Sequence, residues 1–258
     1  MTVQHHPWSR YVAIGDSFTE GVGDPDPDAP GGLRGWADRV AEQLAIGTED
    51  FAYANLAVRG KLIKQIVDEQ LEAAIALRPD LITLSAGGND VIRPGADPDK
   101  IAALFEYAVD RLTSDRATVV VFTGVDVGFS SVFGRIRGRV AIYNENIRRI
   151  AAKYDCVVAD QWALTEIQDA RYWAPDRLHL NSLGHHAVAR MVLAALAVPS
   201  DLASQRPAPH TVPTWREART EDLTWAREYL APWVLRRIRH QSSGDHITAK
   251  RPAASALD

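Results

Sequence analysis

The sequence contains little cysteine and no long apolar run, and both absences narrow its class. Cys156 is the only cysteine among 258 residues, so neither an intramolecular disulfide nor a multi-cysteine zinc site can form. No stretch approaches the roughly 18 apolar residues of a membrane-spanning helix. The apolar run that begins at Tyr11 is too short for the core of a signal peptide. We therefore expect a cytoplasmic protein without an integral membrane segment.

An excess of positive charge is also missing. The 29 Lys and Arg residues are outnumbered by 33 Asp and Glu residues, which gives a net charge of −4. Such a chain lacks the overall positive field that recruits nucleic acid, so we expect no nucleic-acid partner. Hydrophobic residues make up 46% and charged residues 24% of the chain. These fractions are typical of a folded protein with one large or two small domains.

Short apolar runs alternate with helical patterns from Tyr11 to Leu196, which is typical of βαβ units around a parallel sheet. The expected strands are Tyr11–Gly15, Phe51–Ala57, Leu81–Ala86, Ala117–Gly124 and Cys156–Asp160. The clearest helix spans Asp97–Ser114, with Asp97 as a candidate N-cap. We predict a three-layer α/β/α sandwich with about five parallel strands. In such folds, ligands bind beyond the carboxyl ends of the strands.

The composition changes after Leu196. Residues 198–219 contain four prolines and no apolar period, so we expect a proline-rich linker there. A helical pattern that begins at Thr220 predicts a C-terminal helical extension over residues 220–240. Residues 241–258 are small and polar, which predicts a disordered tail.

Ser17 directly follows the first predicted strand, within the segment Gly15-Asp16-Ser17. A serine at this point exposes its hydroxyl at the sheet edge, near backbone N–H groups that can receive an anion. It fits a nucleophile, and it fits the phosphate-binding loop of a flavodoxin equally well. Thr19 replaces the second glycine of a Gly-x-Ser-x-Gly elbow, so the segment differs from that of the α/β-hydrolases.

The loops after the second and third predicted strands offer hydrogen-bond donors. Asn89 follows Gly87 and Gly88, and its amide can face a developing oxyanion, although an asparagine after glycines is commonly only a turn residue. Gly60 ends the loop after the second strand, and its backbone N–H can join the same hole.

Asp176 lies three residues before His179, just ahead of the last predicted helix of the domain. An aspartate so placed can accept a hydrogen bond from the imidazole and fix its tautomer while the other ring nitrogen faces a serine. An isolated pair of this kind is most often an ordinary surface pair. Its meaning here depends on the other loops.

The aspartate-rich segment and the two pairs of adjacent histidines are weak candidates for metal sites. Aspartates alternate in residues 24–28 as in a calcium loop, but prolines separate them and Ala29 takes the place of the glycine that such a loop needs. The histidine pairs at residues 5–6 and 185–186 lack the spacing of metal ligands, and we expect them on the surface. We predict no metal and no cofactor.

Taken together, these blocks resemble the SGNH hydrolases, the GDSL esterase/lipase family. The Gly-Asp-Ser block, the glycine of the second loop, the Gly-x-Asn-Asp block and the Asp-x-x-His block occur in the family order between Tyr11 and Leu196. The resemblance implies that residues 1–197 form an SGNH hydrolase domain with a flavodoxin-like fold. The C-terminal extension has no counterpart in the minimal family domain.

The resemblance also implies a role for each candidate residue. Ser17 is implied to be the nucleophile, with Asp176 and His179 as the acid and base. The backbone amides of Ser17 and Gly60 and the side chain of Asn89 are implied to form the oxyanion hole.

The expected activity is hydrolysis of a carboxylic ester through an acyl-enzyme on Ser17, with a small-molecule, lipid or sugar ester as the substrate. Transfer of the acyl group to a sugar or another alcohol is the alternative. A non-catalytic flavodoxin-like module that binds phosphate or a nucleotide ranks third, because it leaves Asn89, Asp176 and His179 without a function. The residues indicate no particular oligomeric state.

Overall fold

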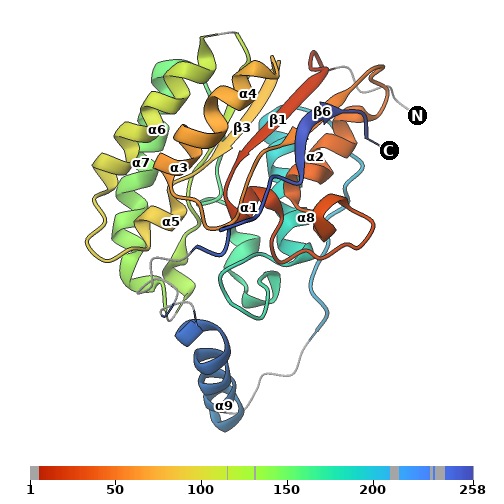
Figure 1. Ribbon diagram of the computed structural model, residues 1–258. Helices are drawn as coiled ribbons and strands as arrows, with labels where there is room; N and C mark the ends of the chain where they lie inside the picture. Colours follow the sequence, from red (N-terminus) through yellow and green to blue (C-terminus); the bar gives the residue numbers. More distant parts are fainter. Residues whose placement is uncertain are drawn as a thin grey trace.

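The computed structural model describes residues 6–114, 116–130, 132–209, 215–232, 235 and 242–257. Its centre is a sheet with the strand order β5-β4-β3-β1-β2-β6 (Figure 1). The strands are β1 (Arg10–Gly15), β2 (Ala52–Asn55), β3 (Leu81–Ser85), β4 (Thr118–Phe122), β5 (Val157–Ala159) and β6 (Arg251–Ser255). The first five pair in parallel, which confirms the expected parallel sheet, and β6 pairs antiparallel with β2.

Helices connect the strands. The α-helices are α1 (Ser17–Glu20), α2 (Trp36–Ala45), α3 (Ile63–Ile66), α4 (Glu72–Ala76), α5 (Gly88–Val91), α6 (Pro98–Thr113), α7 (Arg137–Tyr154), α8 (Ser182–Ala195) and α9 (Trp215–Trp225). Short 3₁₀ turns are η1 (Pro30–Gly32), η3 (Val127–Phe129), η4 (Gly134–Ile136), η5 (Thr165–Gln168) and η6 (Ala170–Tyr172). The π-helical segments are η2 (Val67–Leu71) and η7 (Ala226–Leu230).

The central strand β1 is buried on both faces, as its uninterrupted apolar sequence predicts. Because side chains alternate along a strand, Tyr11 and Ala13 face one apolar cluster, whereas Val12 and Ile14 face the other. The sheet therefore separates two hydrophobic cores, and helices must cover both.

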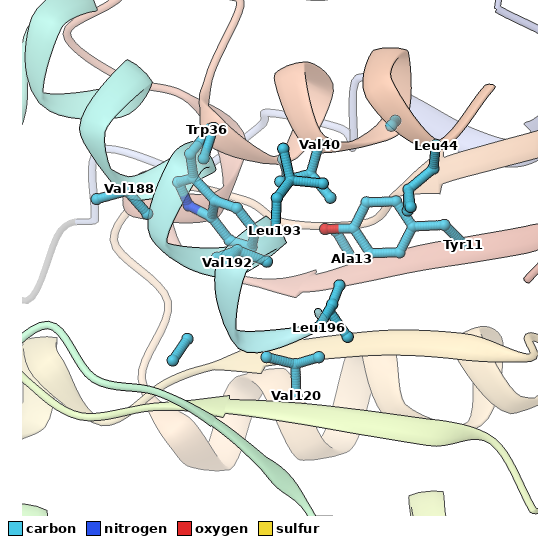
Figure 2. Packing of buried hydrophobic residues seen from close by; sticks show 14 of the residues in the cluster. Tyr11, Ala13, Trp36, Val40, Leu44, Val120, Val188, Val192, Leu193 and Leu196 are labelled. Atoms are coloured by element: carbon cyan, nitrogen blue, oxygen red, sulfur yellow. The ribbon is translucent and has the colours of Figure 1, made fainter. Parts of the chain in front are cut away.

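Helices α2 and α8 cover one face of the sheet. Their apolar side chains pack on the strands, as Trp36, Val40, Val192 and Leu193 do around Tyr11 in Figure 2. Helices α3, α4, α6 and α7 cover the opposite face, on the left of Figure 1. The predicted three-layer α/β/α sandwich is thus confirmed.

The start of helix α6 is fixed by the N-capping residue that the sequence indicates. Asp97 is its N-cap and accepts hydrogen bonds from the backbone N–H of Asp99 and Lys100. Pro98 occupies the first turn, where its missing N–H costs no intrahelical bond.

The chain end differs from the expected disordered tail. Residues 251–255 form β6 at the edge of the sheet, where Tyr53 lies opposite Ser255 and Asn55 lies opposite Arg251. The ammonium of Lys250 lies 2.6 Å from Asp38 Oδ2 and donates to Leu33 O at 3.0 Å. Composition gave no signal for this strand because strand pairing uses backbone groups, and the buried lysine before the strand is a single residue.

The helical extension also starts earlier than expected. Helix α9 begins at Trp215, inside the segment that we expected to be linker, and η7 follows it. In Figure 1, α9 lies apart from the sandwich, beyond the carboxyl ends of the strands. The second short helix expected after Pro232 falls mostly outside the described residues. No helix in the described part of the chain is long and apolar enough to cross a bilayer.

Lys250 provides a test of the anchor of β6. Its side chain is 3% exposed, so Lys250→Met leaves the buried Asp38 carboxylate without its cation. We expect the free energy of unfolding to fall by about 3 kcal/mol, measured by urea denaturation. Lys100→Met is the matched control because Lys100 is 86% exposed in its ion pair with Asp97. Equal losses in the two variants would show that the buried pair does not anchor the strand.

Candidate active site

Ser17 begins α1 immediately after β1, at the carboxyl edge of the sheet. Glycine is required two positions earlier, because a Cβ on Gly15 would lie 2.6 Å from both Ser85 O and Thr19 Oγ1. The amide of Gln70 accepts from Gly15 N–H at 2.8 Å and donates to Gly15 O at 2.9 Å. The N–H and C=O groups of Gly15 at the end of β1 are therefore both hydrogen-bonded, which fixes the backbone just before Ser17.

His179 connects Ser17 to Asp176. Its Nε2 lies 3.0 Å from Ser17 Oγ, and its Nδ1 lies 2.6 Å from Asp176 Oδ2. The carboxylate accepts from Nδ1–H, which leaves Nε2 free to accept the serine proton. Asp176 Oδ1 accepts from the backbone N–H groups of Leu178 and His179, each at 3.0 Å. The loop that carries the histidine thus also orients its aspartate.

Asp176 remains ionised in this setting. Burial opposes its ionisation, but the side-chain hydrogen bond from His179 and the backbone N–H groups outweigh burial. The pKa of Asp176 is therefore held below its ordinary value. A fixed negative charge beside Nδ1 stabilises an imidazolium when Nε2 gains a proton.

Gly60 lies in the turn after β2, where its φ of 76° is unfavourable for other residues. Its neighbour Arg59 binds Glu20, a buried residue of α1. The backbone N–H of Arg59 donates to Glu20 Oε2 at 2.7 Å, and its guanidinium Nε donates to Glu20 Oε1 at 3.0 Å. This pair joins the glycine loop to the helix that begins at Ser17.

Asn89 lies on the short helix α5, whose N-cap Gly87 has a φ of 88°. A Cβ on Gly87 would lie 2.3 Å from the hydroxyl of Tyr143, which donates to Ala86 O at 3.0 Å. Asn89 Nδ2 donates to Asp16 Oδ2 at 3.0 Å and to Lys61 O at 3.1 Å. One amide thus connects the loops that follow β1, β2 and β3.

Two backbone donors lie at the same place. Within the described residues, the N–H groups of Ser17 and Gly60 donate no hydrogen bond to the protein, and both residues line one cavity. Asn89 lines it as well. Backbone and side-chain donors therefore gather beside the serine hydroxyl.

Two cavities meet at Ser17, Asn89 and His179, which line both of them. The first has a volume of about 220 Å³. Most of its lining is apolar and includes Val91, Phe122, Val125, Val127, Phe129, Phe133, Val140 and Trp173. The second has a volume of about 470 Å³ and is lined by Gly60 together with Trp225, Glu228 and Tyr229 of the C-terminal extension. Most of the lining of both cavities is apolar, but only the second adds the side chains of Arg59, Glu228 and two serines, so we call the first the apolar cavity.

Asp16 is the buried charge of the site. Only 6% of it is exposed, and this burial raises its pKa to about 6. The backbone N–H of Phe18, at 3.1 Å, the charge of His179 and the bond from Asn89 oppose the rise, whereas the nearby Asp90 adds to it. At neutral pH, the buried ionised carboxylate of Asp16 therefore destabilises the fold, and the hydrogen bonds from Phe18 and Asn89 offset part of that cost.

The structure gathers all five residues singled out from the sequence, namely Ser17, Gly60, Asn89, Asp176 and His179, around one cavity. Sequence analysis missed their supports. Glu20 and Gln70 stand in no recognisable motif, although Gln70 lies in the π-helical η2, and such segments often occur at functional sites. No pattern in the sequence indicates that these two side chains reach β1 and the glycine loop.

The expectation that residues 185–186 lie on the surface is wrong. His185 is fully buried; its Nδ1 accepts from Trp36 N–H and its Nε2 donates to Val22 O, each at 3.2 Å. Burial lowers the pKa of His185 to about 4, so it stays neutral. Asp24, from the aspartate-rich segment, pairs with buried Arg39. The described residues contain no group of three or more His, Cys, Asp or Glu placed to hold a metal ion.

Known proteins resemble this chain both in sequence and in structure. Residues 13–187 match the GDSL-like lipase/acylhydrolase family. The uncharacterised protein YpmR of Bacillus subtilis (strain 168) is 34% identical over 86 residues. That match spans 32% of this chain and 32% of YpmR, so the chain corresponds to about a third of that relative.

Solved structures share the fold. LAE5, an alpha/beta hydrolase enzyme from the metagenome of Lake Arreo, aligns with a TM-score of 0.60 at 20% identity, over 73% of this chain and 95% of LAE5. Axe2, an acetylxylan esterase from Geobacillus stearothermophilus, aligns with a TM-score of 0.60 at 18% identity, over 76% of this chain and 96% of Axe2. At this level of identity, the likeness establishes the architecture alone.

The buried carboxyl of Asp16 yields a prediction about pH. Its raised folded-state pKa means that protonated Asp16 stabilises the fold at low pH, and this contribution is lost as the pH rises through about 6. Asp16→Asn stays neutral throughout. We expect the variant to be more stable than the wild type by up to about 3 kcal/mol at pH 8, and the difference to vanish near pH 4.

Urea denaturation at both pH values measures this difference. The exposed Asp28→Asn is the control. A difference between Asp16→Asn and wild type that does not change with pH would contradict a raised pKa at Asp16.

Proposed function

The chain belongs to the GDSL-like lipase/acylhydrolase family, and we propose that it cleaves carboxylic esters through an acyl-enzyme formed on Ser17. The observation that carries this proposal is the continuous hydrogen-bonded chain from Ser17 Oγ through His179 to Asp176. A serine, a base and a residue that orients the base are the arrangement that activates a hydroxyl as a nucleophile.

In the first half of the proposed reaction, His179 Nε2 takes the proton of Ser17 as Oγ attacks the carbonyl carbon. The imidazolium that forms is stabilised by Asp176. The negative oxygen of the tetrahedral intermediate is received by the backbone N–H groups of Ser17 and Gly60. Asn89 joins them when its amide exchanges the bond to Lys61 O for a bond to the oxyanion.

Collapse of this intermediate breaks the bond to the alcohol, and His179 returns its proton to the departing oxygen. Water then attacks the acyl-enzyme with His179 again as the base. The bond to Ser17 Oγ breaks, His179 returns the proton to Oγ, and the carboxylic acid leaves. Transfer of the acyl group to a second alcohol in place of water is the alternative outcome of the same intermediate. Chromatography of the products with and without an added alcohol distinguishes the two.

The apolar cavity supports a particular acyl group. It is bounded by rings and branched side chains, among them Phe122, Val140 and Trp173. One water molecule needs a cavity of about 10–15 Å³, so a space of about 220 Å³ has room for many more heavy atoms than the few of an acetyl group. Axe2 is an acetylxylan esterase. For this chain we propose a longer apolar acyl group.

The first test of the mechanism compares variants of the site. Ser17→Ala is expected to abolish hydrolysis of p-nitrophenyl esters and labelling by a fluorophosphonate probe. Asn89→Ala is expected to lower kcat by about 10²- to 10³-fold, because loss of one oxyanion donor costs roughly that much. Stopped-flow absorbance gives both rates. Substantial turnover by correctly folded Ser17→Ala would rule out the acyl-enzyme on this residue.

The second test concerns acyl chain length. We expect kcat/KM of p-nitrophenyl esters to rise from acetate to octanoate by up to about fourfold per methylene group. Burial of one methylene group in the cavity contributes about 0.8 kcal/mol to binding. Val125→Phe fills part of the cavity and should move the optimum to shorter chains. Leu223→Phe on the exposed surface of α9 is the control. A preference for acetate would contradict the proposed acyl site.

A further inference from the structure

The C-terminal helix contacts the loop that carries Asp176 and His179. Arg177 Nη1 lies 2.6 Å from Asp222 Oδ1 of α9, and the Arg177 guanidinium lies 5.2 Å from the centroid of the Trp225 ring. Trp225 Nε1 donates to the backbone O of Asp176 at 2.9 Å. The helix that appears separate from the sandwich is thus attached at the residues next to the reacting groups.

Arg177 shows that this attachment matters for the loop. Its φ of 57° places a non-glycine residue in the left-handed region, a conformation that needs support from its surroundings. The backbone N–H of Arg177 donates to Ala174 O at 2.9 Å within the loop, and the ion pair with Asp222 and the contact with the Trp225 ring add support from α9. Trp225 itself is 9% exposed, so its ring is packed rather than displayed.

The same extension supplies one wall of the second cavity. Gly60, Asn89 and His179 line it from the side of the sandwich, and Trp225, Glu228 and Tyr229 line it from the side of α9 and η7. Ser242 and Ser243, which follow later in the chain, lie over Gly60, since a Cβ there would approach Ser242 Oγ within 2.4 Å. The C-terminal segment therefore forms one side of the cavity beside Ser17.

The proposed reaction assigns an occupant to this cavity. If the acyl chain fills the apolar cavity, the alcohol portion extends from the carbonyl carbon to the other side of Ser17. His179 lines that side and is the group that returns a proton to the departing oxygen. The second cavity thus corresponds to the alcohol.

The lining of the cavity indicates which alcohol fits. Glu228 offers a carboxylate acceptor for hydroxyl protons, and Ser242 and Ser243 offer hydroxyl groups that both donate and accept. The ring of Tyr229, which is 37% exposed, offers flat apolar surface for the C–H face of a ring or chain. Acceptors beside an aromatic face suit a compound with several hydroxyl groups on a carbon framework.

We propose that the C-terminal extension, through Trp225, Glu228 and Tyr229, forms the binding site for the alcohol portion of the ester, and that this portion is polyhydroxylated, as in a sugar or a polyol. The proposal rests on the ester-hydrolase function proposed above. It assigns to the extension the role of selecting one half of the substrate.

The experiment uses the full-length protein and two esters with the same acyl group, methyl octanoate and glucose 6-octanoate. Both give the same octanoyl-enzyme, so a difference in kcat/KM between them reports on the alcohol site. Wild type is expected to prefer the glucose ester. Glu228→Gln is expected to lower the glucose-to-methyl ratio of kcat/KM by about tenfold, the value of one hydrogen bond to a charged group. Tyr229→Ala is expected to lower the same ratio, because it removes a ring face from the site.

Glu49→Gln is the matched control, because Glu49 is exposed in the turn before β2, at the opposite edge of the sheet. A purely structural role of the extension would lower kcat/KM for both esters equally and leave the ratio unchanged, which would overturn the proposal. A wild-type preference for methyl octanoate would overturn it as well. Failure of the function itself looks different, since neither ester would then turn over in a Ser17-dependent manner.

Discussion

The hydrogen bond between Ser17 Oγ and His179 Nε2 joins residues that are 162 positions apart in the chain. Its length of 3.0 Å is met only because both partners are fixed at the carboxyl edge of the sheet. Gln70 holds the backbone before the serine, and Asp176 holds the ring of the histidine. In the proposed mechanism, small displacements of the reacting groups lower the rate, so these supports would decide how fast the reaction runs.

The sandwich was predictable from the sequence because its signals are local. Strand β1 is an apolar run that ends at Gly15, and α6 starts where Asp97 caps it and Pro98 fits its first turn. Strand β6 carried no such signal, since it contains Pro252 and pairs only along one edge. What places it is Lys250, and the attraction of a lysine to a carboxylate more than 200 positions earlier leaves no trace in a sequence pattern.

The site divides in the same way. Ser17, Asn89 and His179 belong to blocks whose order and spacing could be recognised, and the structure gathers them. The groups that hold the blocks together could not be recognised, because Glu20 and Gln70 act across the fold through single side chains. Burial was equally hidden: adjacent histidines such as His185 suggest a surface, yet two backbone partners satisfy its ring in the core. The raised pKa of Asp16 was hidden for the same reason, because it follows from burial and not from the spacing of residues in the sequence.

The pairing of β6 with β2 means that the chain between α8 and β6 returns to the sheet. With Lys250 buried and β6 bonded to β2, helix α9 belongs to a loop that is anchored at both ends instead of a free chain terminus. A helix on a chain held at one end already meets its partner as an intramolecular event, and a second anchor restricts the positions that the helix can sample, which raises its effective concentration at the partner. After Trp225 separates from Asp176, the two anchors keep it nearby, so the wall of the cavity re-forms more readily than it would on a chain held at one end.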